Sequence, residues 1–468
     1  MSERIGERLI GKKRITGDQL RKALEHQRLT GGRLGQNLVA LGMVKEEDLA
    51  SCFKEVPPVP RSIEETGLHP SFVANLILKH AIQVEEFRAQ EMGERVKLPV
   101  SIVDKVLDDL RRDHFVSVKG AGQISRLSYV FAISDTGRRR VADLQRLTRY
   151  AGPAPVPLEE YRRTVELQTV KSVMVSEERV RNAFTHLIMS ERLLNRLGPA
   201  VSSGKEIFLY GPSGNGKTTI AETVARILPG MIYVPYAVIV GGEIVTVYDK
   251  VNHAAVEPEF GPDLVDQRSV LIKRPVVMVG GEMTLKSLDL DFNPISKFYE
   301  APLQMKANNG LFIVDDFGRQ QIDPQHLLNR WIVPLERRTD FLSLHTGMKF
   351  EIPFDQLVVF STNIEPKKLV DEAFLRRIRY KIEINHPPLE EFEAIFKRVC
   401  ETNGITLDKE TFSFLIENFY RRQNVKFNAC HPRDLVDHVI DSAHYKGKPP
   451  ELTPESLSDA WENYFVKM

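Results

Sequence analysis

The sequence is poor in cysteine, in net charge and in long apolar runs. It has three cysteines in 468 residues, Cys52, Cys400 and Cys430, and they lie far apart. This spacing argues against a disulfide scaffold and against a four-cysteine zinc site, and it indicates a reducing compartment. The formal net charge is +1. No overall basic field therefore indicates nucleic-acid binding, and no acidic tail is present.

Signals for export or for a membrane span are also missing. The N-terminus is charged and lacks the apolar core of a signal peptide. The longest apolar stretch, near 232–247, is interrupted by Pro235, Gly241, Gly242 and Glu243, so it does not predict a membrane span. We therefore expect a cytoplasmic protein, and its length suggests about three domains.

A glycine-rich loop is the most informative feature that is present. Residues 211–218 read GPSGNGKT, after an apolar run at 207–210 and before a helix-like stretch at 219–225. Glycines allow backbone N–H groups to converge on phosphate at the positive end of a helix. Lys217 is expected to reach the β- and γ-phosphates of ATP, and the Thr218 hydroxyl to hold Mg²⁺. The predicted ATP-binding residues are Gly211, Pro212, Ser213, Gly214, Asn215, Gly216, Lys217, Thr218 and Thr219.

Two later strand-like runs end in polar residues. The run 311–314 is followed by Asp315 and Asp316, and the run 357–362 is followed by Asn363. We expect Asp315 to hold Mg²⁺ through water and Asp316 to act as the general base that polarises the attacking water. Asn363 is expected beside the γ-phosphate, where it would help to orient that water.

Arginines follow these motifs. Arg376 and Arg377 lie in a short segment after Asn363, and Arg433 begins a helix in the C-terminal region. An arginine in such a place can reach the phosphate of a neighbouring subunit and offset charge that develops in the transition state.

In order and spacing, these motifs resemble those of AAA+ ATPases. The resemblance makes 211–218 the Walker A motif, 311–316 the Walker B motif, Asn363 sensor 1 and Arg433 sensor 2. It also makes Arg376 or Arg377 an arginine finger. It implies a P-loop α/β core, a parallel sheet with flanking helices plus a small helical lid. It further implies a homo-oligomeric ring, with a hexamer as the expected form, that remodels a protein partner.

The segment 310–378 resembles the MoxR type of this family. In that type the Walker B strand leads to a helix, a β-hairpin and then the sensor 1 strand. Here these elements are expected at 325–336, at 341–344 with 349–352, and at 357–362.

The chain departs from the family in two places. The family usually has Asp-Glu where this chain has Asp315 and Asp316, and the shorter side chain suggests slow hydrolysis. A long interval between the Walker motifs is interpreted as an insertion, about 235–300. Its His253 and nearby acids match no metal-site spacing, so a solvated loop is expected there.

Proline-rich segments at 55–60 and 152–157 are interpreted as semi-rigid spacers. They divide the chain into three units, roughly 1–56, 62–150 and 160–468, and the motifs above divide the last unit further, which gives five predicted parts. These are a helical repeat domain at 1–56, a winged-helix-like α+β domain at 62–150, a linker and lead-in helix at 151–175, the α/β core at 176–385, and the helical lid at 386–468.

The first part contains a repeat in which Arg4, Gly6 and Leu9 recur at a constant offset as Arg33, Gly35 and Leu38. It resembles the N-terminal domain of type II secretion and type IV pilus assembly ATPases, which binds cyclic di-GMP. The match departs from the family pattern at Ile5, Lys13, Phe53 and Val56. The resemblance gives the candidate cyclic-dinucleotide residues Arg4, Gly6, Leu9, Arg33, Leu34, Gly35 and Leu38, with Leu9 and Leu38 as an apolar floor.

The second part has the element order of a winged helix. Helices are expected near 72–82 and 99–112, and a β-hairpin over 115–133. Six basic residues could contact DNA: Lys97, Lys105, Arg111, Arg112, Lys119 and Arg126. Aspartates at 104, 108, 109 and 113 share the presumed recognition helix and would repel phosphate. A structural or partner-docking role is therefore favoured over DNA binding.

Three functions remain open. The favoured one is a protein-remodelling AAA+ ATPase whose N-terminal unit either senses cyclic di-GMP, and so controls the ATPase, or docks a partner. The second is an ATP-dependent DNA-binding regulator that acts through the winged helix. The third is a secretion or pilus motor, but three dispersed cysteines cannot build the zinc site common in that family.

Overall fold

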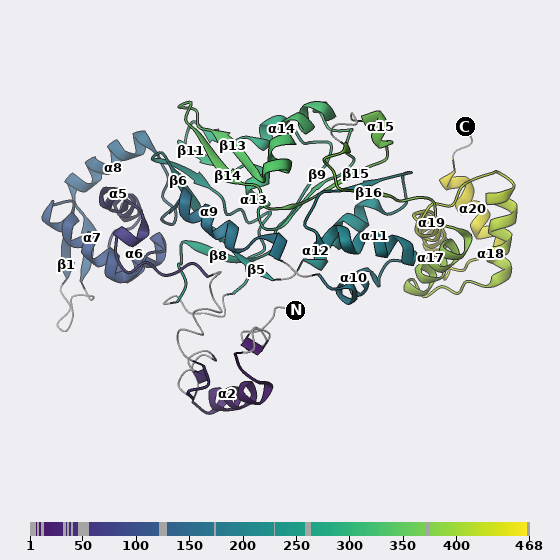
Figure 1. Ribbon diagram of the computed structural model, residues 1–468, viewed down its shortest axis with the longest axis horizontal. Coiled ribbons are helices and arrows are strands. Elements are labelled where there is room, and N and C mark those ends of the chain that lie inside the picture. Colours follow the sequence, from purple (N-terminus) through teal and green to yellow (C-terminus); the bar gives the residue numbers. More distant parts are fainter. Residues whose placement is uncertain are drawn as a thin grey trace.

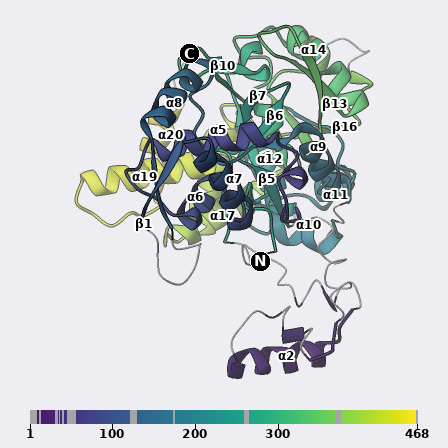
Figure 2. The ribbon, with the colours of Figure 1, turned by 90° about the vertical axis from the view of Figure 1, so that its left-hand side faces the viewer.

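The structure, a computed structural model, describes residues 6, 9–10, 14–30, 34, 37–38, 41–44, 56–120, 129–172, 175–228, 230–257, 264–369 and 375–465. Helices α5 to α8 lie at one end of its longest axis and α17 to α20 at the other, with the two five-stranded sheets between them (Figure 1). Helix α2 (Gly17–Thr30) lies apart from these elements in both views (Figures 1 and 2). Among the described residues, no helix has the length and apolar character needed to cross a membrane.

The described part of the N-terminal unit is helical and has a small core. Leu9, Ile15, Ala23, Leu38 and Val44 are buried together. They come from both halves of the repeat.

The second unit contains more helix than the sequence predicts. The predicted helices correspond to α5 (Pro70–Ala81) and α7 (Val100–Arg112), and α6 (Ala89–Val96) and α8 (Asp135–Leu147) were not foreseen. The predicted hairpin is formed by β1 (Val116–Gly120) and β2 (Val130–Ile133), which pair antiparallel. Phe87, between α5 and α6, adds one bridge to Phe131 at the free edge of β2. The apolar stripe of α7 is buried as its periodicity predicts, at Ile102, Val103, Val106, Leu107 and Leu110.

The central sheet is parallel throughout. Its order is β16 (Tyr380–Glu383), β4 (Ile207–Tyr210), β15 (Leu357–Thr362), β12 (Leu311–Val314) and β9 (Val276–Val279). The three inner strands are apolar runs because parallel strands are buried on both faces.

Helices cover both faces of this sheet, and successive strand residues face opposite layers. Ile207 and Leu209 pack in the cluster formed with α10 (Glu177–Phe184), α11 (Glu191–Ser202) and α12 (Lys217–Ile227). Phe208 packs on the other face with the buried side chains of α14 (Pro324–Arg337). The predicted α/β core is thus confirmed. Because successive side chains of a strand point to opposite faces, each strand contributes side chains to both helical layers.

The lid follows the last strand of the sheet. It consists of α17 (Leu389–Thr402), α18 (Lys409–Leu415), the π-helical turn η5 (Ile416–Arg421), α19 (His431–Tyr445) and α20 (Pro454–Tyr464). Its core combines aliphatic side chains with aromatic ones, among them Phe392, Phe396, Tyr420 and Trp461. A small helical lid was predicted, and a small helical lid is present.

A second sheet fills the region between the central sheet and the second unit. Its order is β10 (Asp291–Asn293), β11 (Phe298–Glu300), β7 (Glu243–Thr246), β6 (Ala237–Val240) and β3 (Val156–Pro157). Beside it lie the antiparallel pair β5 (Met231–Pro235) and β8 (Ser269–Lys273) and the predicted hairpin β13 (Thr339–Ser343) and β14 (Lys349–Pro353). Short helical segments complete the region: η1 (Glu64–Thr66), α9 (Leu158–Leu167), η3 (Val170–Ser172), η4 (Leu285–Leu288), α13 (Leu303–Lys306) and, near the central sheet, α15 (Pro366–Leu369).

The expected insertion at about 235–300 is therefore not one continuous addition. Strand β9 lies inside that interval and pairs in parallel with β12 at the edge of the central sheet. Its sequence, VVMV, resembles that of the other short strands of the interval, so the sequence alone does not reveal which sheet it joins.

The second proline-rich segment, 152–157, is packed structure and not the spacer that its composition suggests. The Ala154 N–H donates to the Val96 carbonyl at 2.8 Å, and His80 Nε2 donates to the Gly152 carbonyl at 3.0 Å. The segment then continues as β3, an edge strand, where the missing N–H of a proline is tolerated. Composition was misleading because the apolar residues between the prolines are buried.

The second unit and the second sheet share one hydrophobic core. Ala237 and Ile244, from β6 and β7, lie in the same buried cluster as the side chains of α5, α6 and α7. Ile239 and Phe298 pack against that cluster from the sheet. The boundary predicted near residue 150 therefore does not separate two hydrophobic cores, since the regions before and after it share one core.

Arg268 joins the parts that meet at this boundary. Its side chain is 1% exposed and pairs with Asp266 at 2.7 Å and with Glu160, on α9, at 3.2 Å. The guanidinium also donates to the carbonyls of Thr66, at 2.9 Å, and Pro155, at 3.3 Å. One buried cation thus ties the second unit, the proline-rich segment and α9 together.

Candidate functional site

The glycine-rich loop connects β4 to α12 at the carboxyl end of the sheet. Gly211, Gly214 and Gly216 have φ angles of 139°, 76° and 79°. Only glycine adopts these angles without strain, which explains the spacing of the glycines in the motif. The loop ends at the first turn of α12, where free N–H groups and the helix dipole favour an anion.

Lys217 is held inside the loop. Its side chain is only 6% exposed, and Nζ donates to the carbonyls of Gly211 at 3.0 Å and Pro212 at 2.8 Å. Burial lowers the pKa of Lys217, and the nearby carboxylates of Asp316 and Asp315 oppose that shift.

Thr218 and Asp315, both predicted to hold magnesium, lie side by side. The Thr218 hydroxyl donates to the Asp315 carboxylate at 2.9 and 3.1 Å. A hydroxyl and a carboxylate are the hard oxygen donors that Mg²⁺ prefers, so this pair fits the ion.

Asp316 has an unusual backbone conformation for a residue other than glycine, with φ at 46°. Its carboxylate accepts a hydrogen bond from Asn363 Nδ2 at 3.0 Å. The two residues meet because they follow β12 and β15, which are neighbours in the sheet. Left-handed backbone at an aspartate is sparsely populated and recurs at functional sites.

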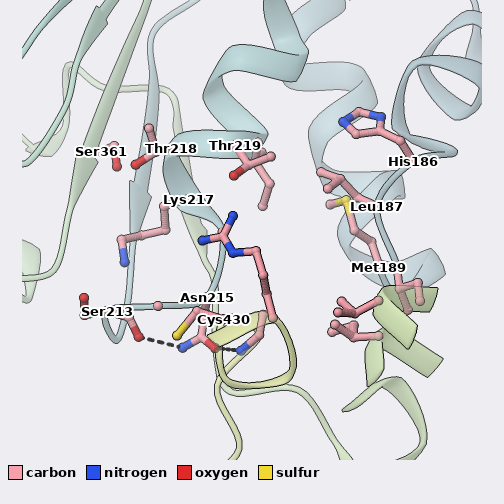
Figure 3. Close-up of a pocket in the computed structure, with 18 of the residues that line it drawn as sticks. His186, Leu187, Met189, Ser213, Asn215, Lys217, Thr218, Thr219, Ser361 and Cys430 are labelled. Atoms are coloured by element: carbon pink, nitrogen blue, oxygen red, sulfur yellow. Dashed lines mark hydrogen bonds between the residues drawn. The ribbon is translucent and has the colours of Figure 1, made fainter. Parts of the chain in front are cut away.

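These side chains surround a cavity of about 510 Å³ between the core and the lid. Lys217, Thr218 and Ser361 lie on one side of it, His186, Leu187 and Met189 face them, and Asn215 and Cys430 lie at its base (Figure 3). One wall is polar and offers N–H donors, and the opposite wall is largely apolar. A phosphate chain and a planar base make these complementary demands.

The structure places most predicted residues at this cavity. Ser213 to Thr219, Asp316, Asn363 and Arg433 line it. Gly211 and Pro212 contribute carbonyls that bind Lys217, and Asp315 lies behind Thr218. Arg433 is 71% exposed at the start of α19.

Arg376 and Arg377 are not among the residues that line the cavity. Arg377 forms an ion pair with Glu336 on α14, and Arg376 is exposed. The preceding residues 371–374, part of the predicted motif, lie outside the described residues.

Several lining residues escaped the sequence analysis. The segment 186–189, Arg398 and Cys430 line the cavity. Arg398, on α17, donates to the Thr185 carbonyl at 3.0 Å and so links the lid to that segment. No motif marks these residues, because only tertiary packing brings them to the phosphate loop.

The candidate cyclic-dinucleotide residues are described in part. Arg4, Arg33 and Gly35 lie outside the described residues. Leu9 and Leu38 are fully buried in the small N-terminal core, and Leu34 is half-buried against it. At Gly6 an added Cβ would lie 2.3 Å from Leu20, so this glycine permits close packing on α2.

His253 is not in a solvated loop. It is buried, it accepts a hydrogen bond from the Asp249 N–H at 3.0 Å, and its Nε2 donates to the Lys306 carbonyl at 2.8 Å. Burial lowers the pKa of His253. Within the described ranges, no group of three histidine, cysteine, aspartate or glutamate side chains could hold a metal ion.

Comparison with known proteins adds information about the lid and the fold. Residues 388–463 match a family described as a domain of unknown function, DUF8689. The search of curated proteins gives no match.

Solved structures similar to this chain include NtrX from Brucella abortus in complex with ADP, at 14% identity and a TM-score of 0.38. The match covers 62% of this chain and 58% of that one. The Thermotoga maritima RuvB Holliday junction branch migration motor matches at 14% identity and a TM-score of 0.33, over 63% of this chain and 71% of that one. At this identity the likeness concerns the fold alone. The function of the site is therefore inferred from the strand order and the side chains of this chain itself.

Proposed function

We propose that this chain binds ATP with Mg²⁺ in the cavity between the core and the lid and hydrolyses the terminal phosphate. One observation carries the proposal. The phosphate loop, the Thr218–Asp315 pair and the Asp316–Asn363 pair all meet at the carboxyl ends of neighbouring parallel strands. Ligands of open α/β sheets bind at this edge.

Each residue has a distinct role in this proposal. The N–H groups of 214–218 and the Lys217 ammonium bind the phosphate oxygens. Thr218 and Asp315 hold the metal ion, which would supply charge neutralisation on the phosphates. Asp316 accepts a proton from the attacking water, and Asn363 holds the Asp316 carboxylate in place.

The oligomeric state belongs to the proposal as well. Arg376 and Arg377 do not line the cavity of their own chain, which suits an arginine that acts on a neighbouring subunit's phosphate. We therefore propose a homo-oligomeric ring, with a hexamer as the expected form, that uses ATP to remodel a protein partner.

For the second unit we propose a winged-helix fold with a partner-docking role. The order α5, Phe87 bridge, α6, α7 and the β1–β2 hairpin supports the fold. On α7, the Arg111 guanidinium lies 3.6 Å from the Asp108 carboxylate, and Arg112 forms an ion pair with Asp109. These aspartates compete with phosphate for the arginines, so the pairing favours a protein partner over DNA.

Lys217→Ala is the direct test of the nucleotide site. The change removes the only side-chain cation in the phosphate loop, so we expect ATP binding in the presence of Mg²⁺ to fall below detection by calorimetry. Lys171→Ala, at an exposed lysine outside the cavity, is the control and should bind ATP as the unchanged chain does. Equal ATP affinity in the Lys217 and Lys171 variants would refute the proposal.

Control by cyclic di-GMP is proposed for the N-terminal unit and has its own test. We expect cyclic di-GMP to change the ATPase rate of the unchanged chain but not that of Arg33→Ala, because guanidinium groups stack on guanine and pair with phosphate. Phosphate release, measured with and without the dinucleotide, gives the answer. No change in rate together with no calorimetric binding would remove this ligand from the proposal.

A further inference from the structure

We propose that Asn215 fixes the helical lid to the phosphate loop, so that docking of the lid and binding of a nucleoside triphosphate strengthen each other. The inference rests on the nucleotide site proposed above and concerns how that site is regulated. It assigns Asn215 a positioning role, in which the side chain acts on the lid and not on the phosphates.

Two backbone N–H groups of the lid bind acceptors of the phosphate loop. The Ala429 N–H donates to Asn215 Oδ1 at 3.1 Å, and the Cys430 N–H donates to the Gly214 carbonyl at 2.9 Å. Ala429 and Cys430 form the turn that leads into α19. Asn215 is buried, although it belongs to a loop that lines the cavity.

The approach of the lid to the loop is also close in space. A Cβ added at Gly214 would lie 2.7 Å from the Cys430 sulfur and 3.6 Å from the Asn428 Cβ. Any larger residue would push the lid turn away. Gly214 thus allows the backbone angle that the loop requires and also the contact with the lid.

A third residue extends this contact to the point where the chain leaves the core. Asn428 Oδ1 accepts a hydrogen bond from His386 Nδ1 at 2.7 Å and a long one from Asn215 Nδ2 at 3.5 Å. His386 lies between β16 and α17 and also donates to the Phe427 carbonyl at 2.9 Å. We call the set Asn215, His386, Asn428, Ala429 and Cys430 the lid joint.

The lid and the phosphates use different groups of the same loop. Bound phosphate takes backbone N–H groups, whereas the lid takes the Gly214 carbonyl and the Asn215 side chain. The two therefore do not compete. Each one orders the loop, so the second to bind loses less conformational entropy, and the coupling is positive and reciprocal.

Docking of the lid also positions an arginine. Helix α19 begins directly after Cys430 and carries Arg433, which lines the cavity. Loss of the joint would therefore release Arg433 from its place beside the nucleotide. This gives the lid joint a consequence for turnover as well as for affinity.

The test is a double-mutant cycle in the full chain with Asn215→Ala, Asn428→Ala and the double variant. ATP affinity is measured by calorimetry with Mg²⁺. We expect each single change to weaken ATP binding by about 5- to 30-fold, which lies in the lower part of the range of ordinary coupling energies. The double variant should be no more than about threefold weaker than the weaker single variant, because both changes break one joint.

Asn428 makes this test specific, because it is not among the residues that line the cavity. Weaker binding in Asn428→Ala therefore cannot come from a lost contact with the nucleotide. Asn418→Ala is the matched control. Asn418 is an exposed lid asparagine whose side chain donates to the Phe414 carbonyl, one helical turn earlier, and this variant should bind ATP normally.

A second measurement needs no nucleotide. Amide hydrogen exchange at residues 428–431 should be slow in the unchanged chain and faster in Asn215→Ala, because the Ala429 N–H loses its acceptor. Unchanged exchange in this variant, or full ATP affinity in Asn428→Ala, overturns the lid joint. If the unchanged chain binds no ATP but exchange responds as expected, the proposed function and the coupling to ATP fail, whereas the role of Asn215 in holding the lid to the loop stands.

Discussion

Replacing Asp316 with asparagine is expected to lower the rate of ATP hydrolysis by at least about 100-fold while ATP still binds. The amide keeps the size of the side chain but cannot accept a proton from the attacking water. Asn363 Nδ2 now donates to the Asp316 carboxylate, and it can still donate to the amide oxygen, so the local geometry should survive. Phosphate release gives the rate, and calorimetry with Mg²⁺ gives the affinity.

Two outcomes would change this assignment. Hydrolysis by Asp316→Asn at the rate of the unchanged chain would show that Asp316 is not the base. A large loss of ATP affinity would show a binding role for this carboxylate. Asp316→Glu is the informative companion, because the resembled family usually has the longer acid here. If the short Asp316 side chain limits the rate because its carboxylate lies too far from the attacking water, the glutamate variant should hydrolyse ATP at least as fast as the unchanged chain.

Replacing Arg268 with methionine is expected to lower the free energy of unfolding by about 3–5 kcal/mol. The change leaves the Asp266 carboxylate, 1% exposed, without its cation at 2.7 Å. It also leaves the carbonyls of Thr66 and Pro155 without a donor. An uncompensated buried charge costs more than the lost attraction alone, which is why removal of one partner is so destabilising.

Urea unfolding followed by circular dichroism measures this effect. Arg421→Met is the matched control, since Arg421 pairs with Glu417 on the exposed surface of the lid. Exposed pairs contribute little, so the control should unfold close to the unchanged chain. Equal midpoints for the Arg268 and Arg421 variants would contradict the role of Arg268 at the domain boundary.

Local patterns were sufficient to predict the core. The runs 207–210, 311–314 and 357–362 are short, apolar and followed by glycine or polar residues, and they form three adjacent strands. The phosphate loop was predicted because its glycines are needed for angles that other residues avoid. In both cases the deciding physics acts within a few residues of chain.

Contacts between distant segments were not predictable in this way. Arg268 looks like an ordinary loop arginine, yet it is buried because Thr66, Pro155 and Glu160, all more than 100 residues away in the sequence, meet around it. Asn215 reads as a variable position of the motif, and only the fold brings Ala429 to it. The sequence of β9 predicts a strand, but its pairing with β12 depends on the topology of the whole core.

The packed proline-rich segment determines where this chain can be shortened. A fragment that starts at residue 158 would lack β3 and would uncover Ala237 and Ile244, which the second unit now covers. Exposed aliphatic surface beside an unpaired strand edge promotes aggregation. A fragment made for crystallisation or binding studies should therefore begin at residue 56 or before, and keep 56–465 as one folding unit.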